Sequence, residues 1–322
     1  MGAEAGNAEL LRATLHGWLA GPTAVGKSEV ALRLCEMRGL SLLSLDSRQI
    51  YRGLDIGTAK PSAEERRRVP HLLIDRLDPT EACSAGRYRE LALAALSGLR
   101  ASGRRALAVG GAGLYWEALT RPLHDLPRAS AEIRARHEEI LRREGSAGLH
   151  AELRRVDPET AARLSPNDRQ RISRALEVAA LAGRPLSELL RAGRPAALDL
   201  PVAVLERPPA ELRERIAARA AAMLDAGLLE EIRGLIAAGV PPEAPAFRSV
   251  GYREFLPHLL RGEPLEACRA RFLQATWLYA RRQQTWLRGR VPGHHVVRAE
   301  AGETVDRLAA RVGEALRDPR PA

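Results

Sequence analysis

Eight residues near the amino terminus have the types and spacing needed to hold a diphosphate or a triphosphate. The segment Gly21-Pro22-Thr23-Ala24-Val25-Gly26-Lys27-Ser28 satisfies the P-loop pattern GxxxxGK[ST]. Glycines in such a loop allow backbone N–H groups to face phosphate oxygens, and the amino end of the following helix adds a positive field. Lys27 would neutralise phosphate charge, and the Ser28 hydroxyl would ligate Mg²⁺. The motif therefore predicts what is bound without identifying the reaction.

A carboxylate is expected beside this loop. Asp46 follows the apolar run 40–45 and opens the segment Asp46-Ser47-Arg48-Gln49-Ile50-Tyr51-Arg52-Gly53. In a parallel sheet, the carboxyl end of this run would lie at the same edge as the P-loop. The carboxylate could then act as a general base or assist a magnesium ion, although Asp is also a favoured helix N-cap. Polar residues beside a phosphate site favour the functional interpretation.

Alternating apolar and helical segments indicate how these groups are positioned. Apolar runs that predict strands occupy residues 14–20, 40–45, 107–109 and 201–206. Helical spacing is found at 28–38, 88–99, 211–237 and 265–288, and another helix is expected beyond residue 300. Strands alternating with helices predict an α/β fold. We expect a P-loop core with a parallel β-sheet flanked by helices, and a ligand site at the carboxyl ends of its strands.

The pattern changes between residues 119 and 199. Ala, Arg, Glu and Leu recur there at helical spacing, and turns are marked by Pro127, Gly145, Pro158, Pro166 and the segment 183–185. We therefore predict an all-helical insertion domain at 119–199. Residues 1–118 and 200–322 would form the P-loop core.

The overall composition limits the classes of protein to be considered. The 322 residues are 45% hydrophobic, enough for a packed core, and their formal net charge of +10 favours an anionic partner such as nucleic acid. Lys27 and Lys60 are the only lysines, and both lie in motif segments. Three separated cysteines indicate neither a disulfide framework nor a zinc site, and no apolar run is long enough for a membrane span. We expect a cytoplasmic protein and, by default, a monomer.

Three arginine-bearing segments could face RNA. Within 166–178, Arg171, Arg174 and Glu177 recur every three residues on one helical face. Residues 248–254 combine arginines with Tyr252 and a glycine, and residues 267–299 contain arginines but neither Asp nor Glu. Aromatic and arginine side chains together can stack on bases and hold phosphates. A solvated arginine face, a turn with a partly buried tyrosine, and tryptophans in the core are the structural alternatives.

Three segments resemble the successive signatures of one enzyme family. GPTAVGKS at 21–28, DSRQIYRGLDIGTAKP at 46–61 and GGAGLY at 110–115 are similar to motifs of the tRNA dimethylallyltransferases, also called tRNA isopentenyltransferases. The likeness extends from about residue 21 to residue 290. It implies that the P-loop holds dimethylallyl diphosphate. It also implies transfer of the prenyl group to N6 of the adenosine on the 3′ side of the anticodon in transfer RNA.

The resemblance also implies roles for individual residues. Asp46 would accept a proton from the N6 amine, which is otherwise a poor nucleophile. Thr23, Lys27, the loop amides, Mg²⁺ and an arginine would stabilise the departing diphosphate. That arginine is matched to Arg215, in the helix that opens at Pro209. The target adenine is expected to leave its stack and enter a channel from the side opposite the diphosphate.

Contacts with the anticodon stem-loop are implied by the same match. The residues assigned to RNA are Asp46, Ser47, Arg48, Gln49, Ala112, Arg134, Gln170, Arg171, Ile172, Ser173, Arg174, Arg248, Ser249, Val250, Gly251, Tyr252 and Arg253. Two positions depart from the family pattern: Ala112 stands where a threonine is usual, and Trp277 where a basic residue is frequent. For Ala112 we expect slower or looser RNA positioning with activity retained, and for Trp277 the loss of a phosphate contact. The chain resembles the bacterial form, which has no carboxyl-terminal zinc finger.

Other functions are compatible with parts of the sequence. A small-molecule P-loop kinase would need ATP and no RNA, and the arginine-rich segments disfavour it. A relative that prenylates free adenine nucleotides would have less use for the helical insertion. A non-catalytic RNA-binding protein would not need the intact set of Lys27, Ser28 and Asp46.

Overall fold

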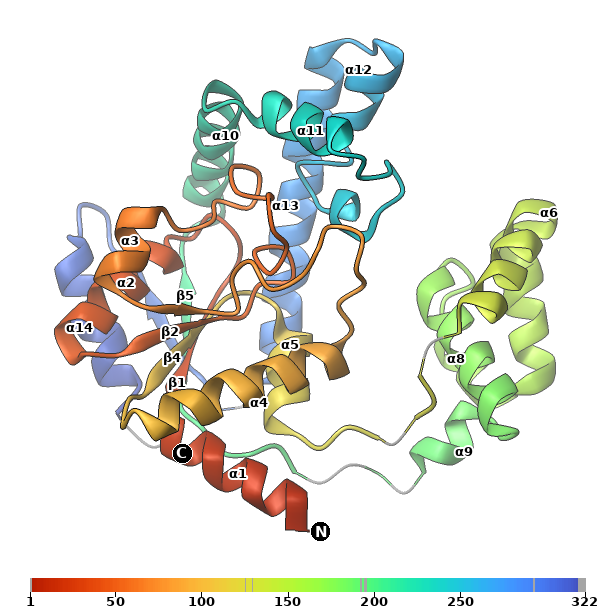
Figure 1. The fold of residues 1–322 in the computed structure, drawn as a ribbon, viewed down its shortest axis with the longest axis horizontal. Coiled ribbons are helices and arrows are strands. Elements are labelled where there is room, and N and C mark those ends of the chain that lie inside the picture. Colours follow the sequence, from red (N-terminus) through yellow and green to blue (C-terminus); the bar gives the residue numbers. More distant parts are fainter. Residues whose placement is uncertain are drawn as a thin grey trace. The chain divides into compact units, whose positions relative to one another are not determined.

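A computed structural model describes residues 2–124, 126–128, 130–191, 193, 196–291 and 293–317. At its centre is a six-stranded sheet in the order β3-β2-β4-β1-β5-β6, and every strand pairs in parallel with its neighbours (Figure 1). The strands are β1 Leu15–Ala20, β2 Ser41–Ser44, β3 His71–Leu72, β4 Ala106–Val109, β5 Val202–Glu206 and β6 His295–Arg298. The predicted α/β class and parallel sheet are confirmed.

Helices cover both faces of this sheet, as buried β-strands with alternating faces require. On one face, Trp18 and Val204 belong to a core that includes α1 Gly2–Thr14, α4 Ala85–Ala101 and α5 Gly113–Thr120. On the other face, Leu19 and Leu205 pack with α2 Lys27–Arg38 and α14 Val305–Ala315. Two successive residues of one strand thus enter two different cores.

This part of the chain contains further helices. They are α3 Ala63–Arg68, α10 Pro209–Asp225, α11 Leu228–Ala237, the 3₁₀ turn η1 Pro245–Arg248, α12 Leu256–Arg261 and the long α13 Leu265–Arg290. The helical segment predicted at 211–237 is two helices, because Gly227 adopts a left-handed φ of 96° and ends the first. Helix α13 packs against both α10 and α5.

Two short strands and the first helix were not predicted from the sequence. Strand β3 contains two residues and β6 contains four, and neither forms an apolar run long enough to be recognised. Helix α1 also went unpredicted, whereas the helix expected beyond residue 300 is α14.

Contacts divide the chain into two compact units, residues 1–120 with 197–322 and residues 121–196. The second unit consists of α6 Ala131–Val156, α7 Pro158–Arg163, α8 Arg169–Ala182 and α9 Leu186–Leu190. Its own apolar core is formed by Leu149, Leu153, Ala161, Ile172, Ala175 and Leu176. Gly145, expected in a turn, lies within α6 at a kink with φ 67° and ψ −170°. In the described ranges of both units, no helix is long and apolar enough to cross a membrane.

Candidate active site

The P-loop leaves β1 after Ala20 and enters α2 at Lys27. Gly26 precedes the helix with φ 100° and ψ 13°, a left-handed conformation that glycine adopts without steric penalty. At Gly21, whose φ is +146°, a Cβ would lie 2.7 Å from the carbonyl oxygen of Leu205. The tight turn between strand and helix therefore depends on both glycines of the motif.

Three side chains from distant parts of the sequence brace this loop. Arg207 and Arg215 each donate through Nε to a loop carbonyl oxygen at 2.9 Å, Val25 O for the first and Ala24 O for the second. Gln283 Oε1 accepts from the N–H of residue 23 at 2.8 Å, and Gln283 Nε2 donates to the carbonyl of residue 111 at 3.1 Å. These bonds fix the loop backbone before any ligand binds.

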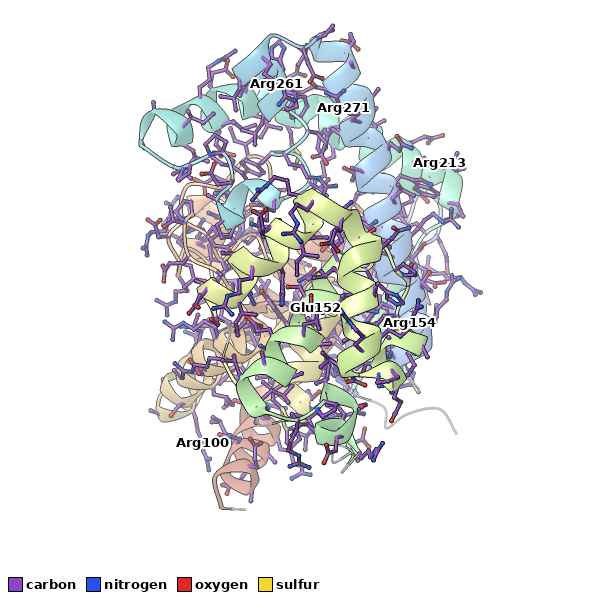
Figure 2. The ribbon with its side chains drawn as sticks, turned by 90° about the vertical axis from the view of Figure 1, so that its right-hand side faces the viewer. Arg100, Glu152, Arg154, Arg213, Arg261 and Arg271 are labelled. Atoms are coloured by element: carbon purple, nitrogen blue, oxygen red, sulfur yellow. The ribbon has the colours of Figure 1, made fainter. Side chains whose placement is uncertain are left out.

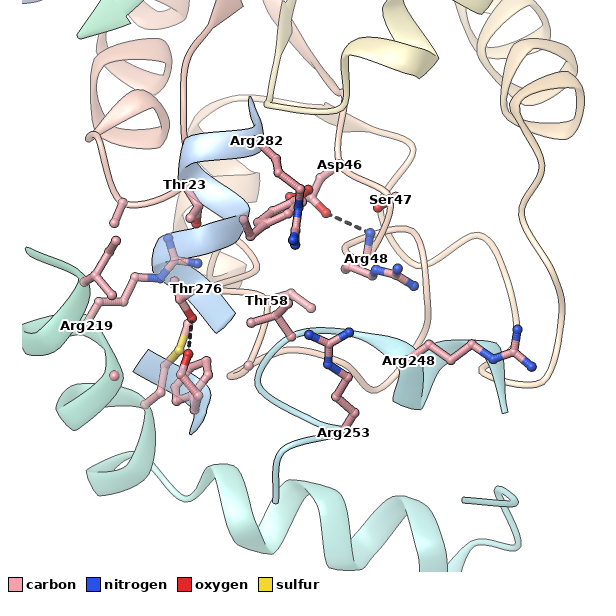
Figure 3. A pocket seen from close by; sticks show the side chains of 18 residues that line it. Thr23, Asp46, Ser47, Arg48, Thr58, Arg219, Arg248, Arg253, Thr276 and Arg282 are labelled. Carbon is pink, nitrogen blue, oxygen red and sulfur yellow. Dashed lines mark hydrogen bonds between the residues drawn. The ribbon is translucent and has the colours of Figure 1, made fainter. Parts of the chain in front are cut away.

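A cavity of about 270 Å³ opens beside the P-loop (Figure 3). Its walls come from the P-loop, the segment after β2, the loop at 57–58, α10, the loop before α12, and α13. The lining residues are Thr23, Ala24, Asp46, Ser47, Arg48, Gly57, Thr58, Ile216, Arg219, Ala220, Met223, Arg248, Val250, Arg253, Phe272, Thr276, Tyr279 and Arg282. The cavity lies at the carboxyl ends of parallel strands, where ligands of such sheets bind.

Asp46 enters this cavity in a defined orientation. Its Oδ1 accepts from the N–H of Arg48 at 2.7 Å and from the N–H of Gln49 at 3.3 Å, and Figure 3 draws the shorter bond. Its Oδ2 accepts no hydrogen bond from any residue that the structure describes. One carboxylate oxygen is thus used for positioning, and the other is available to a ligand in the cavity.

Two cations at this site have no carboxylate partner. Lys27 Nζ donates to the carbonyl of Pro22 at 2.5 Å, and Arg219 projects from α10 into the cavity (Figure 3). Neither forms an ion pair with a described residue. Burial, and then the charge of Arg219, lowers the pKa of Lys27 to about 7, although Asp46 acts in the opposite direction. Burial lowers the pKa of Arg219 as well. An unpaired positive charge in such a place favours binding of an anion.

A second group of arginines surrounds the rest of the cavity. Arg48, Arg248, Arg253 and Arg282 all line it, and Figure 3 shows Arg253 reaching in from the loop before α12. Tyr279 lines the cavity beside them. Burial, and then the negative charge of Asp46, raises the pKa of its phenol to about 12, so the hydroxyl stays protonated and able to donate.

Comparisons with known proteins agree with this geometry. Residues 49–290 match the model of the family described as IPP transferase. The chain is 49% identical over 296 residues to the tRNA dimethylallyltransferase of Halorhodospira halophila. The aligned region covers 91% of this chain and 94% of that relative.

The chain belongs to the IPP transferase family. Among solved structures, it is similar to the full-length tRNA isopentenylpyrophosphate transferase of Bacillus halodurans, with a TM-score of 0.65, 31% identity, and coverage of 93% of this chain and 96% of that one. A eukaryotic dimethylallyltransferase acting on tRNA gives a TM-score of 0.75 at 26% identity, with coverage of 92% and 76%. The resemblance drawn from the three motif segments is confirmed.

The structure separates two arginines of α10, of which the family match selected Arg215. Arg215, matched from sequence to the leaving-group role, donates to Ala24 O of the P-loop and does not line the cavity. Arg219, one helical turn later, lines it together with Ala220 and Met223. No local signal distinguished Arg219 from Arg215, because residues four apart share a face of a helix. Sequence reasoning missed Arg219.

Several residues predicted to contact RNA have buried side chains. Tyr252 is 0% exposed, Ser249 1% and Ile172 0%. The Tyr252 ring lies so close to Gly57 that a Cβ there would be 2.5 Å from it. This leaves no free ring face for the expected base stacking. Ser249 donates to Ala246 O at 2.5 Å, and Ile172 lies in the core of the second unit.

Other predicted RNA-contacting residues brace the loops around the cavity. Gln49 Nε2 donates to the carbonyls of residues 58 and 59 at 3.3 and 3.1 Å, and Gly251 donates its N–H to Glu254 at 2.8 Å. Ala112 donates its N–H to Leu45 O at 3.1 Å, immediately before α5. Ser47 and Val250 line the cavity directly.

In the second unit, a buried carboxylate organises two of the predicted RNA-contacting arginines. Glu177, whose side chain is 1% exposed, accepts from Arg174 NH1 at 2.6 Å and from Arg134 Nε at 3.1 Å. One carboxylate therefore holds both guanidinium groups. Gln170 and Arg171 are exposed, and Ser173 lies 2.8 Å from a ring nitrogen of a histidine at position 137.

The arginine-rich stretch at 267–299 is partly neutralised by carboxylates from outside it. Arg271 pairs with Glu263 at 2.7 Å and Arg288 with Glu206 at 3.2 Å. Figure 2 shows Arg271 and Arg261 projecting from α13 and α12. Trp277, the departure from the family pattern, is covered by the guanidinium of Arg213, 4.4 Å from its ring centroid. A cation thus lies at this position, supplied by the neighbouring helix.

The protein oxygens available to a metal ion are few. Within the described ranges, no group of three or more His, Cys, Asp or Glu could hold one. The Ser28 hydroxyl lies in the first turn of α2, and Asp46 has a free carboxylate oxygen. Mg²⁺ commonly uses one or two protein oxygens together with substrate phosphates and water. The residues present fit a magnesium ion that arrives with a diphosphate.

Proposed function

We propose that this chain transfers the dimethylallyl group of dimethylallyl diphosphate to N6 of the adenosine adjacent to the anticodon on its 3′ side, in transfer RNA. The observation that carries the proposal is one cavity in which Asp46, with a free carboxylate oxygen, and the cation Arg219 both lie at the edge of the P-loop. Membership of the IPP transferase family supports the same reaction.

The phosphate side of the cavity suits a leaving diphosphate. As the bond between prenyl C1 and the diphosphate oxygen breaks, negative charge accumulates on that oxygen. Lys27, Arg219 and the N–H groups at the start of α2 would stabilise this charge, because preorganised donors in a partly dehydrated site need little rearrangement. Mg²⁺, held by Ser28 and the diphosphate, would supply further charge neutralisation when bound.

The other side of the cavity suits the nucleotide. The N6 amine attacks prenyl C1, and Asp46 accepts the proton that the amine loses, which leaves a neutral N6-prenylated adenosine. Arg48, Arg248 and Arg253 line this side and would hold phosphates or stack on bases. The exposed Gln170 and Arg171 and the paired Arg134 and Arg174 of the second unit would contact the anticodon stem.

This arrangement disfavours a small-molecule kinase. A kinase acceptor site of this size would not need four arginines in addition to Arg219 in its walls. An RNA loop, by contrast, carries several phosphates whose charge these arginines could neutralise. Prenylation of free adenine nucleotides would leave the arginines of the second unit without a role. We therefore propose transfer RNA and dimethylallyl diphosphate as the substrates, for a monomeric enzyme of the cytoplasm.

The test is product analysis. The purified protein would be incubated with Mg²⁺, dimethylallyl diphosphate and an unmodified transfer RNA that has adenosine on the 3′ side of the anticodon. Its nucleosides would then be separated and identified by mass spectrometry. N6-dimethylallyladenosine at that position is the expected result. No prenylated nucleoside, together with ATP-dependent phosphorylation of a small acceptor, would establish the kinase in its place.

A further inference from the structure

Helix α11 carries a carboxylate on which four hydrogen bonds converge. Glu231 Oε2 accepts from the N–H of Asp55 at 2.9 Å and from the N–H of Ile56 at 2.7 Å. Its Oε1 accepts from the N–H of Gly57 at 3.3 Å and from the hydroxyl of Tyr252 at 2.6 Å. Three consecutive backbone amides and a buried phenol are therefore satisfied by one side chain.

These four donors belong to two separate loops that both form walls of the cavity. The first loop continues from Gly57 to Thr58, and both residues line the cavity. The second contains Tyr252 and contributes Val250 and Arg253 to the lining. Glu231 itself does not line the cavity. Any influence it has on a bound ligand must pass through the two loops.

The two loops approach each other closely at the point where this carboxylate joins them. A Cβ on Gly57 would lie 2.5 Å from the Tyr252 ring, and a Cβ on Gly251, whose φ is a left-handed +97°, would lie 3.6 Å from Gly57 O. The Tyr252 side chain is 0% exposed, so its hydroxyl has no access to water. If Glu231 accepted no bond there, a buried hydroxyl and three amides would lose their acceptor together.

We propose that Glu231 is a positioning residue for the RNA-facing wall of the cavity. By accepting hydrogen bonds from both residues 55–57 and Tyr252, it fixes the positions of Thr58 and Arg253 when the target nucleotide enters. None of the hydrogen bonds of Glu231 goes to the P-loop or to Arg219, so we expect the diphosphate side to be independent of it. The inference rests on the proposed function for the identity of the ligand, but the positioning itself is measurable without turnover.

The decisive variant is Glu231→Gln, because it keeps the shape of the side chain and replaces one acceptor oxygen with a donor NH₂. The matched control is Glu230→Gln, since Glu230 is the neighbouring carboxylate on the same helix and pairs with Arg233 at 2.8 Å. Both variants would be examined by amide hydrogen exchange, by titration with inorganic diphosphate, and by steady-state kinetics with transfer RNA.

In Glu231→Gln we expect amide exchange at residues 55–57 to accelerate by about tenfold or more, as for loss of a bond to a charged acceptor. The KM for transfer RNA should rise about tenfold, while kcat changes by less than about threefold and the affinity for inorganic diphosphate stays within about twofold. Glu230→Gln should match the parent protein in all of these. Tyr252→Phe, which removes one of the four bonds, should shift the same quantities in the same direction by about threefold.

Two results would overturn the inference. One is a KM for transfer RNA in Glu231→Gln equal to that of Glu230→Gln. The other is an equal loss of diphosphate and RNA affinity, which would indicate general destabilisation. If Glu231→Gln does not fold, Tyr252→Phe decides by the same criteria. If the parent protein transfers no prenyl group, the proposed function fails. The positioning role of Glu231 is then still tested by amide exchange at residues 55–57 and by RNA affinity, measured by fluorescence anisotropy.

Discussion

Replacing Lys27 with arginine should remove a pH dependence from diphosphate binding. Burial lowers the pKa of Lys27 to about 7 in the empty site. About half of the Lys27 side chains are then neutral at pH 7 and about nine-tenths at pH 8, and a bound diphosphate would restore their charge. Arginine remains protonated throughout this range.

The expected magnitude follows from proton linkage. The proportion of protein already carrying a charged Lys27 falls about a hundredfold between pH 6 and pH 9, so binding should weaken by the same factor, about 2.7 kcal/mol. The sign is that of a cation whose pKa rises on binding: affinity is full below pH 7 and declines above it. Diphosphate itself titrates in this range, but this contribution cancels in the ratio of the two proteins.

Isothermal titration calorimetry with inorganic diphosphate at pH 6, 7, 8 and 9 would measure that ratio. Two buffers with different ionisation enthalpies at each pH would also give the number of protons taken up, which we expect to be about 0.9 higher at pH 8 for the parent protein than for Lys27→Arg. A ratio of affinities that stays constant from pH 6 to pH 9 would contradict a lowered pKa for Lys27. It would mean that Lys27 is fully charged in the empty site.

Three further substitutions separate the roles assigned above. Arg219→Gln should reduce the single-turnover rate of prenyl transfer about a hundredfold. Arg215→Gln loses one hydrogen bond to the P-loop and should reduce the same rate by less than about tenfold. Equal reductions in the two variants would contradict the assignment. Ala112→Thr should lower the KM for transfer RNA about threefold at unchanged diphosphate affinity, and an unchanged KM would show that the missing hydroxyl has no role here. Glu177→Gln should destabilise the second unit by about 1–3 kcal/mol in thermal unfolding and weaken RNA binding in anisotropy titrations; intact RNA binding would exclude orientation of the arginines by this carboxylate.

The chemistry-bearing motifs were predictable from sequence because local rules determine them. The P-loop needs glycines at fixed positions between a strand and a helix, and those positions are Gly21 and Gly26. Asp46 lies two residues after the end of the buried strand β2, so parallel pairing alone brings it to the edge of the sheet where the P-loop lies. These two segments gave both the fold class and the core of the site.

The other residues of the site depend on tertiary contacts that local patterns do not contain. Arg215 and Arg219 are one turn apart on an arginine-rich helix, and only the packing of α10 shows that the second faces the cavity. The burial of Tyr252 follows from its approach to Gly57, a residue almost two hundred positions earlier. Gln283 joins the P-loop to the turn after β4 across a similar separation. The short strands β3 and β6 exist because longer neighbours offer them an edge to pair with.

Asp46 acts on the reacting amine, whereas Glu231 acts on the loops around it. The most direct test is the single-turnover rate of prenyl transfer for Asp46→Asn, at saturating dimethylallyl diphosphate and transfer RNA, compared with Asp306→Asn, which changes an exposed carboxylate on α14. We expect the rate to fall by a factor of about 10² to 10⁴ in Asp46→Asn at unchanged RNA affinity, and to equal the parent rate in Asp306→Asn. Equal rates in the two variants would contradict Asp46 as the group that accepts the proton.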